Sequence, residues 1–221
     1  MGVGVLLLCA AIGICAYNVW DAHSARMSVQ NVMQEIERVQ GKTTEAAVPV
    51  PPEGTEAPPD DPAPADSQAE EKHPAETEEI ALYKLNPQLA MPTIEIGGRE
   101  YVGVLEIPSL SLTLPIIGSW DYPSLKISPC VYSGTAYLNN MVIAGHNYES
   151  HFGGLNKLRY GDSVVFTDFD GNVFSYKVRE LETVKGTDIE GMIESGWDLS
   201  LFTCTIGGQM RITVRCECVS E

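Results

Sequence analysis

A thiol and a guanidinium lie close together near the end of the chain. Cys204 ends the apolar run Leu199–Thr205, just before the turn at Gly207-Gly208, and Arg211 opens the next apolar run. If the two runs are paired strands, the cation lies near the sulfur, where it favours the reactive thiolate. A cysteine nucleophile also needs a base, and His146, at the end of an apolar run far upstream, is the best candidate.

Each of these residues also has a structural interpretation. A strand cysteine is usually an inert apolar residue, and a lone histidine is as often a structural loop residue as a base. His151 competes with His146 as the base. Strand alternation places Arg211, Thr213 and Arg215 on one face. We prefer Arg211 as the catalytic arginine because it opens the strand directly after the turn.

The part of the chain that carries these residues, 80–221, has the length and composition of one domain. Apolar runs bounded by Gly, Pro, Asn and Asp predict strands at 101–107, 112–117, 141–144, 163–168, 172–184, 199–205 and 211–219. Short helices are predicted at 123–126, 151–158 and 188–195, and Asp170-Gly171 predicts a hairpin. Many short strands at this spacing predict a mainly β fold, either an antiparallel sheet or a closed barrel.

The N-terminus carries an uncharged apolar run, Gly2–Trp20, that is long enough to span a bilayer as a helix. We therefore expect a transmembrane anchor over residues 1–22, with Tyr17 and Trp20 at its outer end. A cleaved signal peptide is the alternative, because Ala22-His23-Ser24 resembles a cleavage site, but the basic segment that should precede the apolar run is missing.

Two segments connect the expected anchor to the domain. Residues 23–40 form an amphipathic helix that we interpret as a stalk, with an apolar stripe at Val29, Val32, Met33, Ile36 and Val39. It is expected to be structural, by packing on another chain or lying on the bilayer surface. Residues 41–79 are rich in Pro, Ala and Glu and predict a disordered acidic linker. This linker supplies more than half of the net charge of −16. A chain this acidic, with few basic residues, is not expected to bind nucleic acid, because phosphate binding needs a basic face. The long acidic segment after the apolar run also favours an outside C-terminus.

The remaining cysteines of the domain are Cys130, Cys216 and Cys218. They are too few and too irregularly spaced for a disulfide framework, although a bond between Cys130 and either of the others stays open. Cys216 and Cys218 lack the second ligand pair of a structural zinc site. We expect buried strand thiols, with no metal and no cofactor.

The motifs together resemble one known family. Ser200–Cys204 is similar to the Thr-Leu-x-Thr-Cys signature of sortases, the membrane-anchored cysteine transpeptidases of Gram-positive bacteria, with Ser200 in place of the usual Thr. Ala144–Asn147 resembles their histidine motif, 152–162 their following loop, and Arg211–Arg215 their arginine strand. The resemblance covers nearly all of 101–219, is closest to class B or D-like members, and implies an eight-stranded β-barrel.

The resemblance also implies roles for individual residues. Cys204 is the expected nucleophile that forms a thioacyl-enzyme, and His146 is the expected acid for the leaving amine and then base for the incoming amine. Arg211 is expected to stabilise the oxyanion or hold the substrate backbone, and Thr203 to contact the substrate. From their place just before the Cys204 strand, residues 184–197 are predicted to form part of the substrate groove. Its apolar candidates are Ile189, Met192 and Ile193.

The family resemblance implies the partners as well. The substrates would be secreted proteins with a C-terminal sorting signal, and the acceptor an amine such as a peptidoglycan precursor or a pilin lysine. The chain would cross the cell membrane once and hold its catalytic domain outside. Two alternatives remain from the sequence: a hydrolytic cysteine peptidase of the same fold, and a non-catalytic membrane-tethered β-domain that binds a cell-surface partner.

Overall fold

The computed structural model describes residues 2–46 and 81–219. The helices are α1 (Gly2–Ala46), α2 (Leu82–Leu85), α3 (Tyr122–Leu125) and α4 (Ile189–Ile193), with short 3-10 turns η1 (Pro108–Leu110), η2 (Ala136–Leu138) and η3 (Leu155–Lys157). The strands are β1 (Ile94–Ile96), β2 (Arg99–Ile107), β3 (Leu112–Ile117), β4 (Cys130–Ser133), β5 (Met141–Gly145), β6 (Ser163–Asp168), β7 (Val173–Lys185), β8 (Leu199–Cys204) and β9 (Met210–Cys218).

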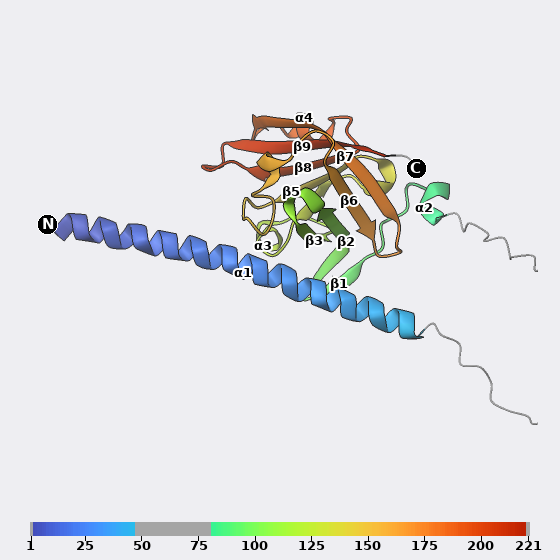
Figure 1. Cartoon of the computed structure of the whole chain (residues 1–221), viewed down its shortest axis with the longest axis horizontal. Helices are drawn as coiled ribbons and strands as arrows, with labels where there is room; N and C mark the ends of the chain where they lie inside the picture. The colour runs from blue at the N-terminus through green and yellow to red at the C-terminus, as the bar shows by residue number, and fades with distance from the viewer. Residues whose placement is uncertain (1, 47–80, 220–221) are drawn as a thin grey trace, which may run out of the picture.

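Eight of the nine strands close into a barrel (Figure 1). Their order is β2-β3-β4-β5-β8-β9-β7-β6, and β6 pairs back with β2 through Gly103 to Glu106. β1 pairs with the start of β2, outside this ring. The neighbours are antiparallel except for two parallel pairs, β3 with β4 and β5 with β8. The eight-stranded closed barrel implied by the family resemblance is therefore confirmed.

The barrel interior is filled by alternate side chains of the strands. Its fully buried members include Leu105, Ile107, Leu114, Ile116, Met141, Ile143, Phe166, Leu199, Leu201 and Val214. The hairpin predicted at Asp170-Gly171 joins β6 to β7, with Gly171 at a φ of 84°. Such a left-handed backbone costs a glycine little, so the turn residue accounts for the register of this pair.

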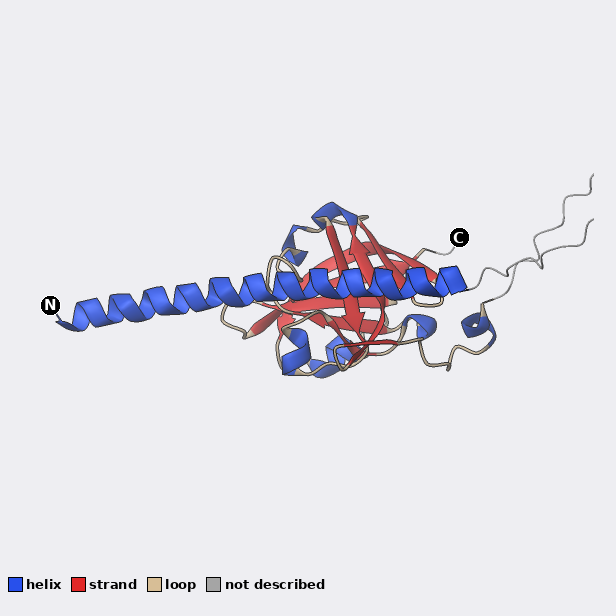
Figure 2. Cartoon of the chain, turned by 90° about the horizontal axis from the view of Figure 1, so that it is seen from below, coloured by secondary structure: helices blue, strands red, loops and turns tan. Residues whose placement is uncertain are grey.

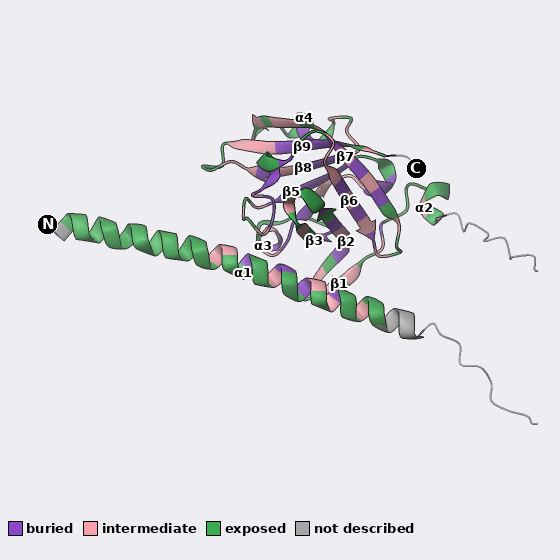
Figure 3. Ribbon diagram, viewed as in Figure 1, coloured by how far each residue is buried: buried purple, intermediate pink, exposed green. Residues whose placement is uncertain are grey.

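Helix α1 is continuous but has two different halves (Figure 2). Residues 3–20 are exposed along their whole length, and this stretch is apolar and long enough to cross a membrane. From Asp21 onward the helix lies along the barrel, and its buried residues face the strands (Figure 3). The two halves meet directly after Trp20, where the apolar run ends.

The predicted stalk stripe packs on the barrel of its own chain. Val29 joins the main core, and Val32 and Ile36 form a second cluster with Tyr101 and Ile117. The expectation that this helix pairs with another chain or lies on the bilayer is thus replaced by intramolecular packing. The helix also runs on to Ala46, into the predicted linker, of which residues 47–79 lie outside the described part of the chain.

All six cysteines lie in the described residues and are free thiols. Cys130 and Cys216 are fully buried in strands, as predicted, and burial raises the pKa of each to about 12. Cys218 and Cys204 are only partly buried. The thiol at the end of β8 is therefore distinguished from the core thiols by its access to solvent.

Candidate active site

The topology brings the three predicted catalytic residues to one end of the barrel. β5 and β8 run parallel with Gly145 opposite Thr203, so the next residues along, His146 and Cys204, emerge side by side. β9 returns antiparallel to β8, and its register pairs Cys204 directly with Arg211. Directly opposite residues of an antiparallel pair lie on the same face, about 5 Å apart at Cβ.

The site lies on the outer surface of the barrel. In β8, Leu199 and Leu201 point into the core, whereas Ser200 contacts Arg215 outside it. Strand alternation therefore sends the Cys204 side chain outward. This arrangement leaves the hydrophobic core intact beneath the reactive groups.

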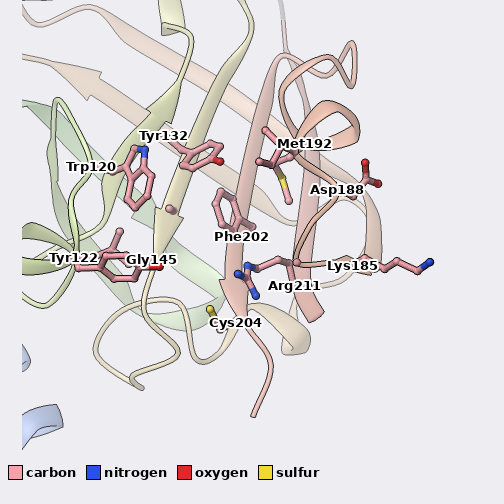
Figure 4. Close-up of a pocket in the computed structure, with 14 residues that line it drawn as sticks. Trp120, Tyr122, Tyr132, Gly145, Lys185, Asp188, Met192, Phe202, Cys204 and Arg211 are labelled. Carbon is pink, nitrogen blue, oxygen red and sulfur yellow. The ribbon is translucent and has the colours of Figure 1, made fainter. Parts of the chain in front are cut away.

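A cavity of about 220 Å³ lies on the outer face of β8 and β9, and Cys204 and Arg211 are among its lining residues (Figure 4). Its lining is Trp120, Tyr122, Leu125, Tyr132, Ala144, Gly145, Lys185, Gly186, Asp188, Ile189, Met192, Phe202, Cys204 and Arg211. One wall comes from the segment around α3, the other from the segment around α4, and the floor from β4, β5, β8 and β9. Figure 4 shows the Arg211 guanidinium near Cys204, with Lys185 and Asp188 directed away from the aromatic side chains.

Two of the four predicted substrate-binding residues line this cavity and two do not. Ile189 and Met192 of α4 are lining residues. Ile193, at the end of the same helix, is not among them. Thr203 is also absent from the lining, because it is 2% exposed and lies one residue out of phase with Cys204 in β8.

The four aromatic side chains of the groove were not singled out from the sequence. Tyr132 packs edge-on against Phe202, with ring centroids 5.3 Å apart, and Trp120 packs against Tyr132 at 5.3 Å. Tyr122 in turn packs against Trp120. The alternation of β8 could have placed Phe202 on the Cys204 face. The signal for a short helix near Pro123 does not show that Trp120 and Tyr122 pack over the same face.

His146 is half-buried where the chain leaves β5. Burial lowers the pKa of its imidazole, and nearby Lys126 acts in the same direction, while Asp21 raises it. The preceding Gly145 is required by packing, since a Cβ there would lie 2.6 Å from the buried Phe152 ring. The lowered pKa favours the neutral imidazole, which is the form that can accept a proton.

His151 does not share this position. Neither histidine is among the lining residues of the cavity, but His151 is 0% exposed whereas His146, directly after the lining residue Gly145, is partly exposed. Burial and the neighbouring His146 lower the pKa of its imidazole to about 4. These properties favour His146 over His151 as the base.

The two arginines on the outer face of β9 have different environments. Arg211 donates to the carbonyls of Gly208, at 2.8 Å, and Met210, at 3.1 Å, which hold it against its own turn beside the cavity. Arg215 is 2% exposed, and its guanidinium is engaged in hydrogen bonds within the protein. It donates to Glu182 Oε1 at 2.7 Å, Ser200 Oγ at 2.9 Å, the Gly191 carbonyl at 2.9 Å and the Met192 carbonyl at 3.4 Å.

Comparison with known proteins agrees with this geometry. The family model described as the sortase domain matches residues 105–219, which is more than half of the chain. The chain belongs to the sortase family. The matched range runs from the middle of β2 to just beyond β9 and contains His146, Cys204 and Arg211.

Individual relatives of this sortase are more distant. Sortase A of Bacillus anthracis is 28% identical over 142 residues, which cover 61% of this chain and 66% of that protein. Among solved structures, sortase C of Clostridium perfringens SM101 is 28% identical, with a TM-score of 0.48, over 58% of this chain and 73% of that one. Sortase C of Streptococcus pneumoniae is 24% identical, with a TM-score of 0.49, over 57% and 72%. The resemblance to class B or D-like members stays a prediction.

Proposed function

We propose that the chain is a membrane-anchored cysteine transpeptidase that cleaves a peptide bond in a sorting signal and joins the acyl part to an amine. The observation that carries this proposal is the register of β5, β8 and β9. It brings Cys204 and Arg211 to a groove lined mainly by apolar and aromatic side chains, and it places His146 next to Cys204 at the ends of two paired strands.

The first half-reaction forms a thioester. The Cys204 thiolate attacks the carbonyl carbon of the scissile peptide bond, and the Arg211 guanidinium stabilises the oxyanion of the tetrahedral intermediate. Collapse of this intermediate breaks the carbon–nitrogen bond. His146, having taken the thiol proton, gives that proton to the leaving amine.

The second half-reaction returns the enzyme to its starting state. An incoming amine attacks the thioester carbonyl while His146 accepts its proton, and the Cys204 sulfur leaves. With water in place of the amine, the same steps give hydrolysis, so the acceptor decides between transpeptidase and peptidase. A peptidoglycan precursor and a pilin lysine are the two acceptors we propose.

The groove supports a peptide substrate with apolar side chains. Ile189 and Met192 on one wall and Trp120 on the other offer apolar surface in the same groove as the nucleophile. The substrate would be a secreted protein that is threaded past Cys204 as an extended chain. The apolar exposed half of α1 supports a single membrane span. On this proposal the barrel lies on the outer side of the membrane.

A transfer assay tests the proposal. The full chain in detergent micelles is incubated with a library of peptides and an amine acceptor, and products are identified by mass. We expect amine-linked products from the wild type and a loss of about 10³-fold or more in rate for Cys204→Ala. Cys218→Ala is the matched control, because this thiol is also partly exposed but lies at the opposite end of β9 from Arg211.

The products separate the alternatives. Products that carry water and never the amine would replace the transpeptidase with a hydrolytic peptidase. Equal turnover by wild type and Cys204→Ala would refute cysteine catalysis altogether. The groove would then be a binding site on a non-catalytic domain.

A further inference from the structure

Helix α1 contacts the loop that carries His146. The Tyr148 hydroxyl donates a hydrogen bond to the carboxylate of Asp21, which is the first residue of α1 after the exposed apolar half. The two residues are 127 positions apart in sequence. The contact therefore joins the start of the docked part of the helix to the loop after β5.

Tyr148 connects this contact to the imidazole. Its ring stacks on His146, with centroids 4.7 Å apart and planes 25° from parallel. It also packs against His151 in a tilted arrangement, with ring centroids 5.5 Å apart. The ring of Tyr148 thus fixes the plane of His146, and the hydroxyl at its far end is held by α1.

The rest of the loop offers weaker constraints on this histidine. Its backbone carbonyl accepts from the Phe152 amide at 3.0 Å, which fixes the main chain but leaves the side-chain torsions free. The Nε2 atom of His146 is buried and has no hydrogen-bond partner within the described residues. Orientation of the ring therefore depends on the stack with Tyr148.

We propose that Asp21 and Tyr148 are positioning residues, which hold the His146 imidazole in its productive orientation only while α1 is docked on the barrel. This inference rests on the proposed function of His146. It makes the membrane-proximal part of α1 a component of the active site, beyond its role as an anchor. Release of α1 at Asp21 would leave Cys204 and Arg211 in place and free the imidazole to rotate.

Charged and titratable groups surround His146 on every packed element. They are Asp21 from α1, Lys126 from the segment after α3, Tyr148 and His151 from its own loop, and Cys204 and Arg211 from the ends of β8 and β9. Among them, Asp21 raises the pKa of His146 and Lys126 lowers it. Removal of the Asp21 charge is therefore expected to lower this pKa further, and this gives a readout that does not depend on turnover.

The experiment uses the full chain in micelles with four changes. Tyr148→Phe keeps the stacked ring and removes the hydroxyl, and Tyr148→Leu removes the stack. Asp21→Ala removes the acceptor, whereas Asp21→Asn keeps an acceptor oxygen without the charge. Tyr160→Phe and Glu35→Ala are matched controls, an exposed tyrosine and a solvent-accessible acidic residue of α1.

We expect Tyr148→Phe and Asp21→Ala each to lower kcat about 5-fold, with KM unchanged, as is typical for loss of one hydrogen bond. The double variant should have the same kcat as either single variant, because both changes break the same hydrogen bond. Asp21→Asn should recover most of kcat and still shift the acid limb of the pH–rate profile downward. Tyr148→Leu should lower kcat at least 10-fold, because the imidazole of His146 is then no longer held in position.

Titration of His146 by NMR separates this inference from the proposed function. The chain has four histidines, and the His146 signal is assigned by its loss in His146→Gln. A downward shift of the His146 pKa in Asp21→Ala and none in Glu35→Ala shows that Asp21 acts on the imidazole even if no substrate is turned over, and the loss of kcat in Tyr148→Phe, which keeps that charge, then supports the positioning role. If the Asp21 and Tyr148 variants lower only the unfolding temperature, with kcat, the pH profile and the His146 titration unchanged, the contact is merely structural and the inference is overturned.

Discussion

Replacement of Arg215 by methionine should separate folding from catalysis on a single strand. Arg215 and Arg211 lie on the same outer face of β9, but their acceptors differ in access to water. Arg211 binds carbonyls of the β8–β9 turn, where Gly208 is exposed. Arg215 binds Ser200, which is 0% exposed, and the buried carbonyl of Met192.

The magnitude follows from the groups that lose their donor. Arg215→Met leaves the Ser200 hydroxyl and the Met192 carbonyl buried and unpaired, at about 1 to 3 kcal/mol each. Glu182 can be rehydrated, because its side chain is 32% exposed. The total of about 4 kcal/mol agrees with the typical cost of breaking a buried ion pair and would lower the unfolding temperature by about 10 °C. Arg211→Met should change the free energy of unfolding by less than about 1 kcal/mol.

The activity should change in the opposite order. At a temperature where all variants are folded, Arg211→Met should lose about 10² to 10³-fold in kcat, as is typical for removal of one oxyanion donor. Arg215→Met should keep kcat within a few-fold and raise KM, because it loosens α4 with Ile189 and Met192. Calorimetry and the amine-transfer assay measure the two effects. Equal unfolding temperatures, or an equal loss of kcat in two folded variants, would refute this assignment.

Three further predictions concern other parts of the chain. Ile36→Ala should destabilise the full chain by about 2 to 4 kcal/mol, measured by thermal unfolding, because Ile36 is 1% exposed against the barrel, whereas Glu37→Ala on the exposed side should not. Alkylation at pH 8 followed by peptide mass mapping should label Cys204 well before Cys216, whose burial raises the pKa of its thiol to about 12. The free energy of unfolding should fall by about 2 kcal/mol between pH 7 and pH 5, because the pKa of His151 is about 4 in the folded chain and 6.5 in the unfolded chain. In this range the unfolded chain binds a proton that the folded chain does not. His151→Phe should remove most of this pH dependence.

The sequence could predict the strands that carry the site because their signals are local. The bounds predicted for β3 and β6 agree with the structure. Those of β5 and β8 differ by one residue at the C-terminal end, those of β7 and β9 by one residue at both ends, and β2 begins two residues earlier than predicted. Pairing of Cys204 with Arg211 followed from one short glycine turn between two apolar runs. β1 and β4 were not predicted. β1 has three residues and ends beside Gly97, and β4 has four residues and begins after Pro129, so each pattern is too short to recognise.

The placement of α1 could not be predicted from its stripe. Val29, Val32 and Ile36 would show the same spacing against a partner helix, a bilayer or the barrel. Residues 47–79 separate the helix from the barrel in sequence, so no local signal connects the two. The buried role of Arg215 was hidden for a similar reason, since its partners come from β7, β8 and α4.

These two unpredicted features explain how a site on the outside of a barrel can be well ordered. β8 and β9 fix Cys204 and Arg211 through six consecutive register pairs, so these two groups need little further support. The other two parts of the site lie outside the sheet ladder. His146 follows the last residue of β5, and α4 is a single short helix between β7 and β8. Each therefore depends on side-chain contacts from a distant element: Asp21 of α1 holds the imidazole through Tyr148, and Arg215 of β9 holds the groove wall. Because the two contacts share no residue, damage to one should affect proton transfer and damage to the other substrate binding, and their effects on kcat/KM should add.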